Sequence, residues 1–253
     1  MFERARGLAL GFLVGAVGSA AALVQAEEKH DLLYRFEPGQ QLKYHCYLVG
    51  KTIENGQASP IRLQFQALEE VTGADAAAGL FLLAERAEKV PGAKFDAPSF
   101  GLVTGEEVIE RQVDAQGRVK SVARYSPGSR YYLRWLVLPG NPVAKGDFWK
   151  YTTTLAFTTR GQALTAPCTI IYVLDKKAAY KGRPCVKIRL QGSYQAAADS
   201  GDRVVLGTIT GWAFFDLERG AVKDLKIQET QNQKVKSEKW AKSVEYELTV
   251  LQE

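Results

Sequence analysis

Apolar and polar residues alternate strictly in several parts of the chain, and this alternation predicts β-strands with one face in water. The pattern is clear in "IRLQF" (61–65), "VKIRLQGSY" (186–194) and "VEYELTV" (244–250). The runs "TIIYVL" (169–174) and "GWAFF" (211–215) are apolar at nearly every position, which is typical of strands covered on both faces. The sequence therefore predicts about a dozen strands and no convincing helix beyond residue 26.

Similar phrases begin twice, once near the N-terminus and once in the middle of the chain. In "FEPGQQLKYHCYL" (36–48) and "LPGNPVAKGDFWKY" (138–151), a glycine precedes a strand with the same spacing of lysine, tyrosine and apolar residues. Further turn glycines recur in the same order at an offset of 103 to 107 residues. The matched pairs are Gly39 with Gly146, Gly79 with Gly182, and Gly117 with Gly220. We infer an internal duplication with a period of roughly 105 residues, which is too long for a solenoid repeat.

The duplication defines the expected fold class and domain organisation. We expect an all-β protein in which duplicated antiparallel meander sheets, of about 12 strands together, form a barrel, a half-barrel or two packed sheets. Residues 27–137 would form the first half and residues 138–253 the second half, with one joint domain as an open alternative. The stretch "SRYYLRWLVL" (129–138), where the halves join, is compatible with either a short helix or a strand.

The first 26 residues have the features of a secretory signal peptide. Arg4 and Arg6 are followed by a long uncharged stretch, and the small residues Val24 and Ala26 precede an acidic segment. This arrangement predicts cleavage after Ala26 and a periplasmic or secreted protein. An uncleaved N-terminal membrane anchor is the less favoured alternative, because residues 7–24 are almost long enough to span a bilayer but contain several glycines and a serine.

Net charge changes the expected partners only slightly. The chain carries a formal charge of +5, with lysines and arginines spread along it rather than clustered. In an exported protein this excess favours peripheral contact with an anionic membrane surface, or with cell-wall polymers, over binding to nucleic acid. An ordinary soluble surface is the simpler explanation, and we expect no nucleic-acid partner.

Three cysteines, Cys46, Cys168 and Cys185, leave at least one thiol unpaired. The only candidate pair is Cys168 with Cys185, because each follows a proline at the start of a strand. If a hairpin turns around residues 176–183, Cys185 lies opposite Leu174, six residues from Cys168 along the strand. At a rise of roughly 3.3 Å per residue this separation is beyond disulfide reach, so we expect buried thiols and no bridge.

The sequence contains no recognisable catalytic or metal-binding motif. The two histidines, His30 and His45, lack the spacing of zinc ligands, and we find no nucleophile elbow, phosphate-binding loop or dinucleotide fingerprint. Strand alternation places His45 on the opposite face from Cys46, which disfavours a Cys–His pair. We therefore expect no enzyme activity and no cofactor.

Carboxylates are the remaining option for catalysis. Asp114 and Asp216 are duplicated, and they would be the acid pair of a hydrolase that acts on glycosides. Each precedes a glycine in a hairpin turn, where an aspartate accepts hydrogen bonds from backbone N–H groups, and we favour this structural role. The glutamate pairs at 69–70 and 106–107 are interpreted as solvated strand ends.

Aromatic residues supply the candidate ligand-binding side chains. We expect most of them to fill the core. Tyr131, Tyr132 and Trp135 lie where the two halves meet, and Trp212 lies in a strand of the second half. With the long loop 90–107 as a movable lid, these four residues would line a cavity for an apolar ligand between the halves.

The second half resembles a loose group of uncharacterised secreted bacterial proteins. The motifs are Leu-Pro, Pro-Val and Gly-Asp-x-Trp within "LPGNPVAKGDFW" (138–149), followed by "YKGRPCVKI" (180–188) and "FFDLERGAV" (214–222). These motifs mark turns and strand starts, so the resemblance implies a fold and no catalytic residues. The group is broadly similar to curved antiparallel sheets such as the periplasmic lipoprotein carriers.

Three classes of function follow from these observations, in order of preference. The first is an exported, non-catalytic protein of the bacterial envelope that binds an apolar ligand or lipid between its two halves. The second is a structural or protein-interaction module of the envelope, with a filled core and an exposed edge strand or apolar patch. The third is a hydrolase that uses carboxylates.

Overall fold

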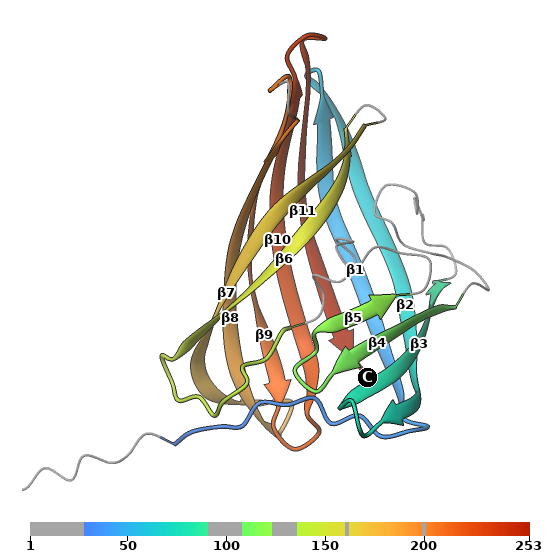
Figure 1. The fold of residues 1–253 in the computed structure, drawn as a ribbon, viewed down its shortest axis with the longest axis vertical. Helices are drawn as coiled ribbons and strands as arrows, with labels where there is room; N and C mark the ends of the chain where they lie inside the picture. Colours follow the sequence, from blue (N-terminus) through green and yellow to red (C-terminus); the bar gives the residue numbers. More distant parts are fainter. Residues whose placement is uncertain (1–27, 91–107, 123–135, 160–161, 199–200) are drawn as a thin grey trace, which may run out of the picture.

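The computed structural model describes residues 28–90, 108–122, 136–159, 162–198 and 201–253. These residues form eleven strands that pair into one antiparallel sheet (Figure 1). The strands are β1 (Gln41–Glu54), β2 (Gln57–Asp75), β3 (Leu80–Lys89), β4 (Ile109–Asp114), β5 (Val119–Val122), β6 (Phe148–Thr159), β7 (Gln162–Tyr180), β8 (Arg183–Ala197), β9 (Arg203–Asp216), β10 (Ala221–Val235) and β11 (Trp240–Gln252). Within these parts of the chain no residue is helical.

Strand order follows the chain except at one position. The sheet runs β5-β4-β3-β2-β1-β11-β10-β9-β8-β7-β6. The strands β1–β5 and β6–β11 each form a meander, and the last strand, β11, lies beside the first, β1. β1 pairs with β11 from Tyr44↔Gln252 to Glu54↔Lys242, which joins the halves into a single sheet. The expected all-β antiparallel meander is confirmed. The sheet is open, because the described edge strands β5 and β6 do not pair with each other.

The sheet curls around the long axis of the molecule, so it has an inner and an outer face (Figure 1). The β1–β2 and β10–β11 turns meet at a narrow end, and the other end of the molecule is broad. Along β1, Tyr44, Cys46 and Leu48 are buried on the inner face, whereas His45 and Tyr47 between them face outward. This period of two confirms that His45 and Cys46 lie on opposite faces.

The hydrophobic core lies on the inner face and forms one continuous cluster across the sheet. Phe65 of β2 and Phe215 of β9 are among its largest members, and each is at most 2% exposed. Burial of one such side chain contributes about 1.5–3 kcal/mol to the hydrophobic stabilisation. Other members from both halves are Cys46, Leu63, Val71, Leu83, Leu155, Ile170, Leu174, Ile188, Ile209, Leu225 and Ile227.

An extended segment, residues 28–38, crosses the broad end of the molecule (Figure 1). Its backbone is held by the β4–β5 turn and the β9–β10 turn together. The N–H of Tyr34 donates to the carbonyl of Ala115 at 2.8 Å, and the N–H of Arg35 donates to the carbonyl of Gly220 at 3.1 Å. The segment buries the side chains of Leu32, Tyr34 and Phe36. Turns from both halves of the chain therefore form hydrogen bonds with the same N-terminal segment.

The two halves share irregularities as well as turns. β2 and β7 each contain a bulge, at Thr72 and at Asp175, where one residue has no partner in the neighbouring strand. β5 and β10 contain corresponding bulges at Lys120 and Lys223. Within each pair the residue numbers differ by 103, which is the offset between Gly79 and Gly182 and between Gly117 and Gly220. The duplication itself stays a prediction, and so does the boundary between residues 137 and 138.

The hairpin assumed around residues 176–183 is wrong in register. β7 continues to Tyr180 before the chain turns, so Cys185 lies opposite Ala178. Cys168 lies ten residues before Ala178 on the same strand. All three cysteines are buried free thiols. Burial, together with the charge of a nearby glutamate, raises the pKa of Cys168 to about 11, so its thiol stays protonated at neutral pH.

Replacing Gly117 by alanine tests how closely the β4–β5 turn packs against the N-terminal segment. A Cβ at this position would lie 2.5 Å from the ring of Tyr34 and 2.6 Å from the carbonyl oxygen of Leu136, in addition to the strain at a φ of +80°. We expect Gly117→Ala to lower the free energy of unfolding by about 3 kcal/mol in urea denaturation.

Gly146→Ala is the matched control. Gly146 has a φ of +88° but open space around its Cβ position, so we expect a loss of only about 1 kcal/mol from backbone strain. Equal losses in Gly117→Ala and Gly146→Ala would contradict a close fit between the β4–β5 turn and the N-terminal segment.

Candidate functional site

Trp212 is the one expected ligand-binding residue that the structure describes. It lies on the outer face of β9, because the adjacent Ala213 is buried on the inner face and successive side chains of a strand point to opposite faces. It therefore does not line the inner face, where the sequence predicts a cavity between the halves. Tyr131, Tyr132 and Trp135 lie outside the described residues, as do residues 91–107 of the expected lid.

Asp114 and Asp216 both serve as turn residues. One carboxylate oxygen of each accepts two backbone N–H groups from its own turn, at 2.9 to 3.0 Å. Burial alone would raise the pKa of Asp114, but hydrogen bonds and charge from Arg118 and Lys120 outweigh it and lower this pKa. The structural role that the sequence predicts for both aspartates is confirmed.

Glu69 is buried rather than solvated, contrary to the expectation from the sequence. Arg111 of β4 donates to Glu69 at 2.5 Å and to Glu85 of β3 at 3.0 Å. All three side chains are at most 1% exposed. Glu69 follows the inward alternation of β2, whereas the neighbouring Glu70 is exposed. The partner Arg111 is 42 residues away, so the sequence around Glu69 carries no sign of the pairing.

A second buried polar cluster lies on the inner face of β8, β10 and β11. Tyr194 and Tyr246 each donate a hydroxyl hydrogen bond to a different carboxylate oxygen of Glu229, which is 1% exposed. Further along β10, the amide of Gln233 donates to Gln231 at 3.0 Å. Both clusters connect strands across the inner face, including strands that are not adjacent in the sheet, which is a structural role.

Removing the Arg111 guanidinium tests whether the first cluster is an ionised, buried network. Arg111→Met leaves the carboxylates of Glu69 and Glu85 buried without their shared cation, so we expect a loss of about 3–5 kcal/mol in the free energy of unfolding. Arg118→Met is the control, because Arg118 pairs with Asp114 while 45% exposed. We expect a loss below about 1 kcal/mol there. Similar small losses from both variants, measured in urea, would contradict an ionised cluster.

A row of hydroxyl side chains crosses the outer face of five neighbouring strands. Thr152 of β6 pairs with Thr169 of β7, and Thr169 pairs with Ser193 of β8. Ser193 pairs in turn with Thr208 of β9, which pairs with Thr230 of β10. Neighbouring strands are about 4.8 Å apart, so this hydroxyl row places one hydroxyl group about every 4.8 Å across the sheet. The hydroxyls of Thr152 and Thr169 are 3.0 Å apart and hydrogen-bonded.

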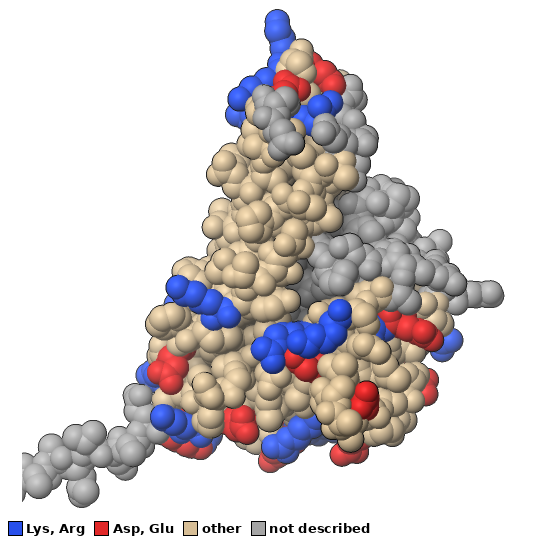
Figure 2. Space-filling view, viewed as in Figure 1, with Lys and Arg blue, Asp and Glu red and all other residues tan. Residues whose placement is uncertain are grey.

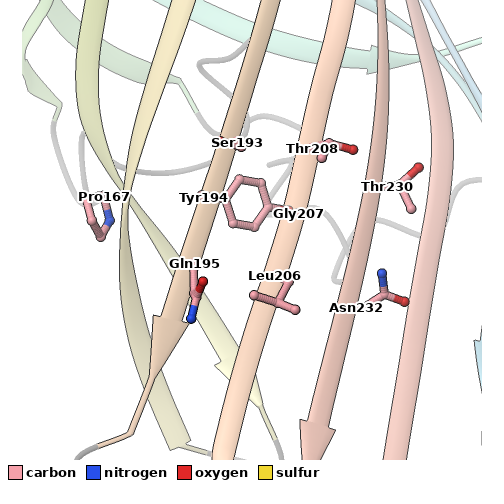
Figure 3. A pocket seen from close by; sticks show the side chains of 9 residues that line it. All are labelled: Pro167, Ser193, Tyr194, Gln195, Leu206, Gly207, Thr208, Thr230 and Asn232. Carbon is pink, nitrogen blue, oxygen red and sulfur yellow. The ribbon is translucent and has the colours of Figure 1, made fainter.

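The hydroxyl row runs through a shallow hollow of about 510 Å³ on the outer face (Figure 3). The hollow is lined by Pro167, Ser193, Tyr194, Gln195, Leu206, Gly207, Thr208, Thr230 and Asn232, none of which carries a charge. Side-chain oxygen and nitrogen atoms reach the hollow from β8, β9 and β10. Among the described residues, the side chains of Gln195, Thr208 and Asn232 have no hydrogen-bond partner, so they are available to a ligand.

Charged side chains gather toward the two ends of the molecule and leave a band between them uncharged, on the face in view (Figure 2). Towards the broad end, the strands of the hydroxyl row carry Arg189 and Lys226 on their outer face. Arg189 pairs with Asp175 at 3.2 Å, and Lys226 pairs with Glu247 at 2.8 Å. Because none of the residues that line the hollow carries a charge, and Arg189 and Lys226 are paired, the hollow suits a neutral ligand.

An aromatic cluster lies on the same outer face, nearer the broad end. Trp212 packs edge-on against Phe214 at a centroid distance of 5.4 Å, and Phe214 stacks on Tyr180 at 4.7 Å. The amine of Lys187 lies 5.5 Å from the centre of the Trp212 ring. Trp212 and Thr208 share a face of β9 and are about 13 Å apart along the strand. The aromatic cluster and the hollow are therefore neighbouring parts of one surface.

A second hollow, of about 500 Å³, lies at the broad end and has a different character. It is lined by several charged residues, some of which are engaged within the chain: Lys43 pairs with Glu253 at 3.1 Å, and Arg35 donates to the carbonyl of Glu218 at 2.9 Å. Hydrogen bonds from His45 and Lys43 lower the pKa of Glu253. The uncharged hollow on β7–β10 is consequently the better candidate for a ligand.

Two features are absent from the described residues. No three His, Cys, Asp or Glu side chains among them lie close enough together to hold a metal ion. Nor does the described part of the chain contain a helix that is long and apolar enough to cross a membrane.

Comparison with known proteins does not place the chain in a family. No protein-family model and no curated protein matches it. A crystal structure of the hypothetical lipoprotein YmcC from Escherichia coli is similar over 84% of this chain and 89% of its own, with 8% sequence identity and a TM-score of 0.31. A DUF1329 family protein from Desulfovibrio piger is similar over 82% of this chain and 84% of its own, with 10% identity and a TM-score of 0.16. Because both TM-scores are low, these two similarities carry no information about the function of this chain.

Proposed function

We propose that this chain is an exported, non-catalytic binding protein of the bacterial envelope, and that its ligand is a neutral, hydroxyl-rich polymer such as a glycan. Export rests on the signal-peptide pattern of residues 1–26. The binding surface is the outer face of β7–β10. A single observation supports it: an uncharged hollow with unengaged amides and hydroxyls adjoins an aromatic cluster on the same face.

The chemistry of the surface matches both aspects of a sugar chain. Hydroxyl groups at the edge of a sugar ring form hydrogen bonds with Thr208 and Thr230, and with the amides of Gln195 and Asn232, because these side chains both donate and accept. The C–H groups on the face of a sugar ring pack against a flat aromatic surface such as Trp212. A polymer that lies along the strands contacts the hollow and the aromatic cluster together.

A hydrolase is not proposed. The turns use a carboxylate oxygen of both Asp114 and Asp216 for backbone hydrogen bonds, and this use accounts for their duplication without catalysis. The carboxylates of Glu69 and Glu85 are bound to Arg111 in the core. These interactions account for each of these carboxylates structurally.

An apolar ligand or lipid on the inner face is the second candidate function. The inner face of the open sheet is apolar, which favours such a ligand. The residues that the sequence nominates for that site, Tyr131, Tyr132 and Trp135, lie outside the described parts of the chain. We prefer the outer face because the inner side chains already pack into one buried cluster.

Calorimetric titration of the exported protein with neutral chito- and cello-oligosaccharides tests the proposal. We expect saturable binding, weakened about tenfold by Trp212→Ala and by a smaller factor by Thr208→Val, where a tenfold loss corresponds to about 1.4 kcal/mol. Thr208→Val keeps the shape of the side chain and removes only its hydroxyl group. Thr249→Val, on the outer face of β11 away from the hollow, is the control and should leave the affinity unchanged.

The same preparation separates the two candidate functions. If the protein binds neither oligosaccharide, glycan binding is wrong. If native mass spectrometry then finds lipid that is released by organic extraction, the inner face is the binding surface instead. Loss of oligosaccharide affinity in Thr249→Val equal to that in Thr208→Val would show that the hollow is not the site.

A further inference from the structure

The two edges of the sheet differ in how they are protected against pairing with another strand. β5, at one edge, is only four residues long and is bulged at Lys120. The amine of Lys120 lies 3.3 Å from the carboxylate of Asp114. A short strand, a bulge and a lysine are features that proteins use to prevent edge strands from pairing with other chains.

β6, at the other edge, lacks these features. It is twelve residues long and pairs with β7 without a register shift. Its sequence contains no proline and no charged residue from Tyr151 to Thr159. Among the described residues, no strand pairs with its outer edge. Thr152 and Thr154 are exposed on the outer face of this strand.

We propose that the outer edge of β6 is an interaction surface at which a second copy of this chain adds its own β6 in antiparallel orientation. The same patch then serves both copies, and the two-fold symmetry closes the assembly as a dimer. If Thr154 lies opposite Thr154 of the second copy, Thr152 lies opposite Ala156. In this register Lys150, the only charged residue of β6, lies opposite an uncharged residue. No like charges are therefore opposed across the new strand pair.

Continuity of the outer surface favours a second copy over an unrelated strand. Thr152 ends the hydroxyl row at the sheet edge, and Thr154 beside it on the outer face lies opposite Thr154 of the second copy, so a second β6 adds further hydroxyl groups next to the row. β6 crosses the front of the molecule in Figure 1, where the same view in Figure 2 shows a band without charge. Two copies that approach through this band meet no repulsion. The dimer requires no ligand, so its test is independent of glycan binding.

Light scattering after size exclusion and native mass spectrometry, over a range of concentrations and without saccharide, test the dimer. We expect the exported wild-type chain to dimerise increasingly as concentration rises. Thr154→Lys places two ammonium groups opposite each other in the dimer, while the side chain stays in water in the monomer. We expect it to raise the dimer dissociation constant about a hundredfold. Thr165→Lys, exposed on the adjacent strand β7, is the control and should dimerise like the wild type.

Thr154→Cys tests the register directly. In the proposed pairing, mild oxidation should join two Thr154→Cys chains into a covalent dimer, whereas Thr165→Cys chains should stay separate. A wild-type chain that is monomeric at every concentration overturns the proposal. So does a Thr154→Lys variant that dimerises as tightly as the wild type, or a Thr165→Lys variant that is impaired to the same extent as Thr154→Lys.

Discussion

The pairing of β1 with β11 is the constraint on which the rest of the structure depends. It joins the first strand of the chain to the last, for example Leu48 to Leu248, and without it the sheet separates into β1–β5 and β6–β11. Contacts between residues so far apart in sequence are slow to form, because the intervening chain must lose its conformational freedom first. The continuous inner core, to which both halves contribute, exists only once this pair has formed.

Curvature gives the two faces of this sheet different roles. The inner face takes most of the buried apolar side chains, together with two buried polar clusters that connect its strands. The outer face is left to the alternate residues, and midway along β6–β10 these include the threonine and serine residues of the hydroxyl row and the amides of Gln195 and Asn232. Stability therefore depends on one face, while the other face is free to vary. This division explains why a candidate ligand surface lies on the outside of a curved sheet.

Local patterns in the sequence predict the parts of this fold that depend on local physics. The period of two along β1 and β8 predicts which residues face inward, and the glycine that follows Asp114 and Asp216 in each turn predicts their capping role. Strand order, register and bulges depend on distant residues. The ion pair of Glu69 with Arg111 connects strands that are not adjacent in sequence. The outward position of Trp212 follows from alternation along β9, but the hydroxyl row becomes visible only when five strands are aligned in register.

The path of the N-terminal segment determines at which end of the molecule any preceding chain is attached. Glu28 pairs with Lys177 at 3.0 Å, and the segment that follows crosses the broad end under both turns. Any chain that precedes Glu28 therefore leaves the fold at the broad end. If residues 1–26 are a leader held in a membrane, as the sequence predicts, the broad end faces the bilayer and the narrow end points away from it. The uncharged band of Figure 2 then stands clear of the lipid headgroups.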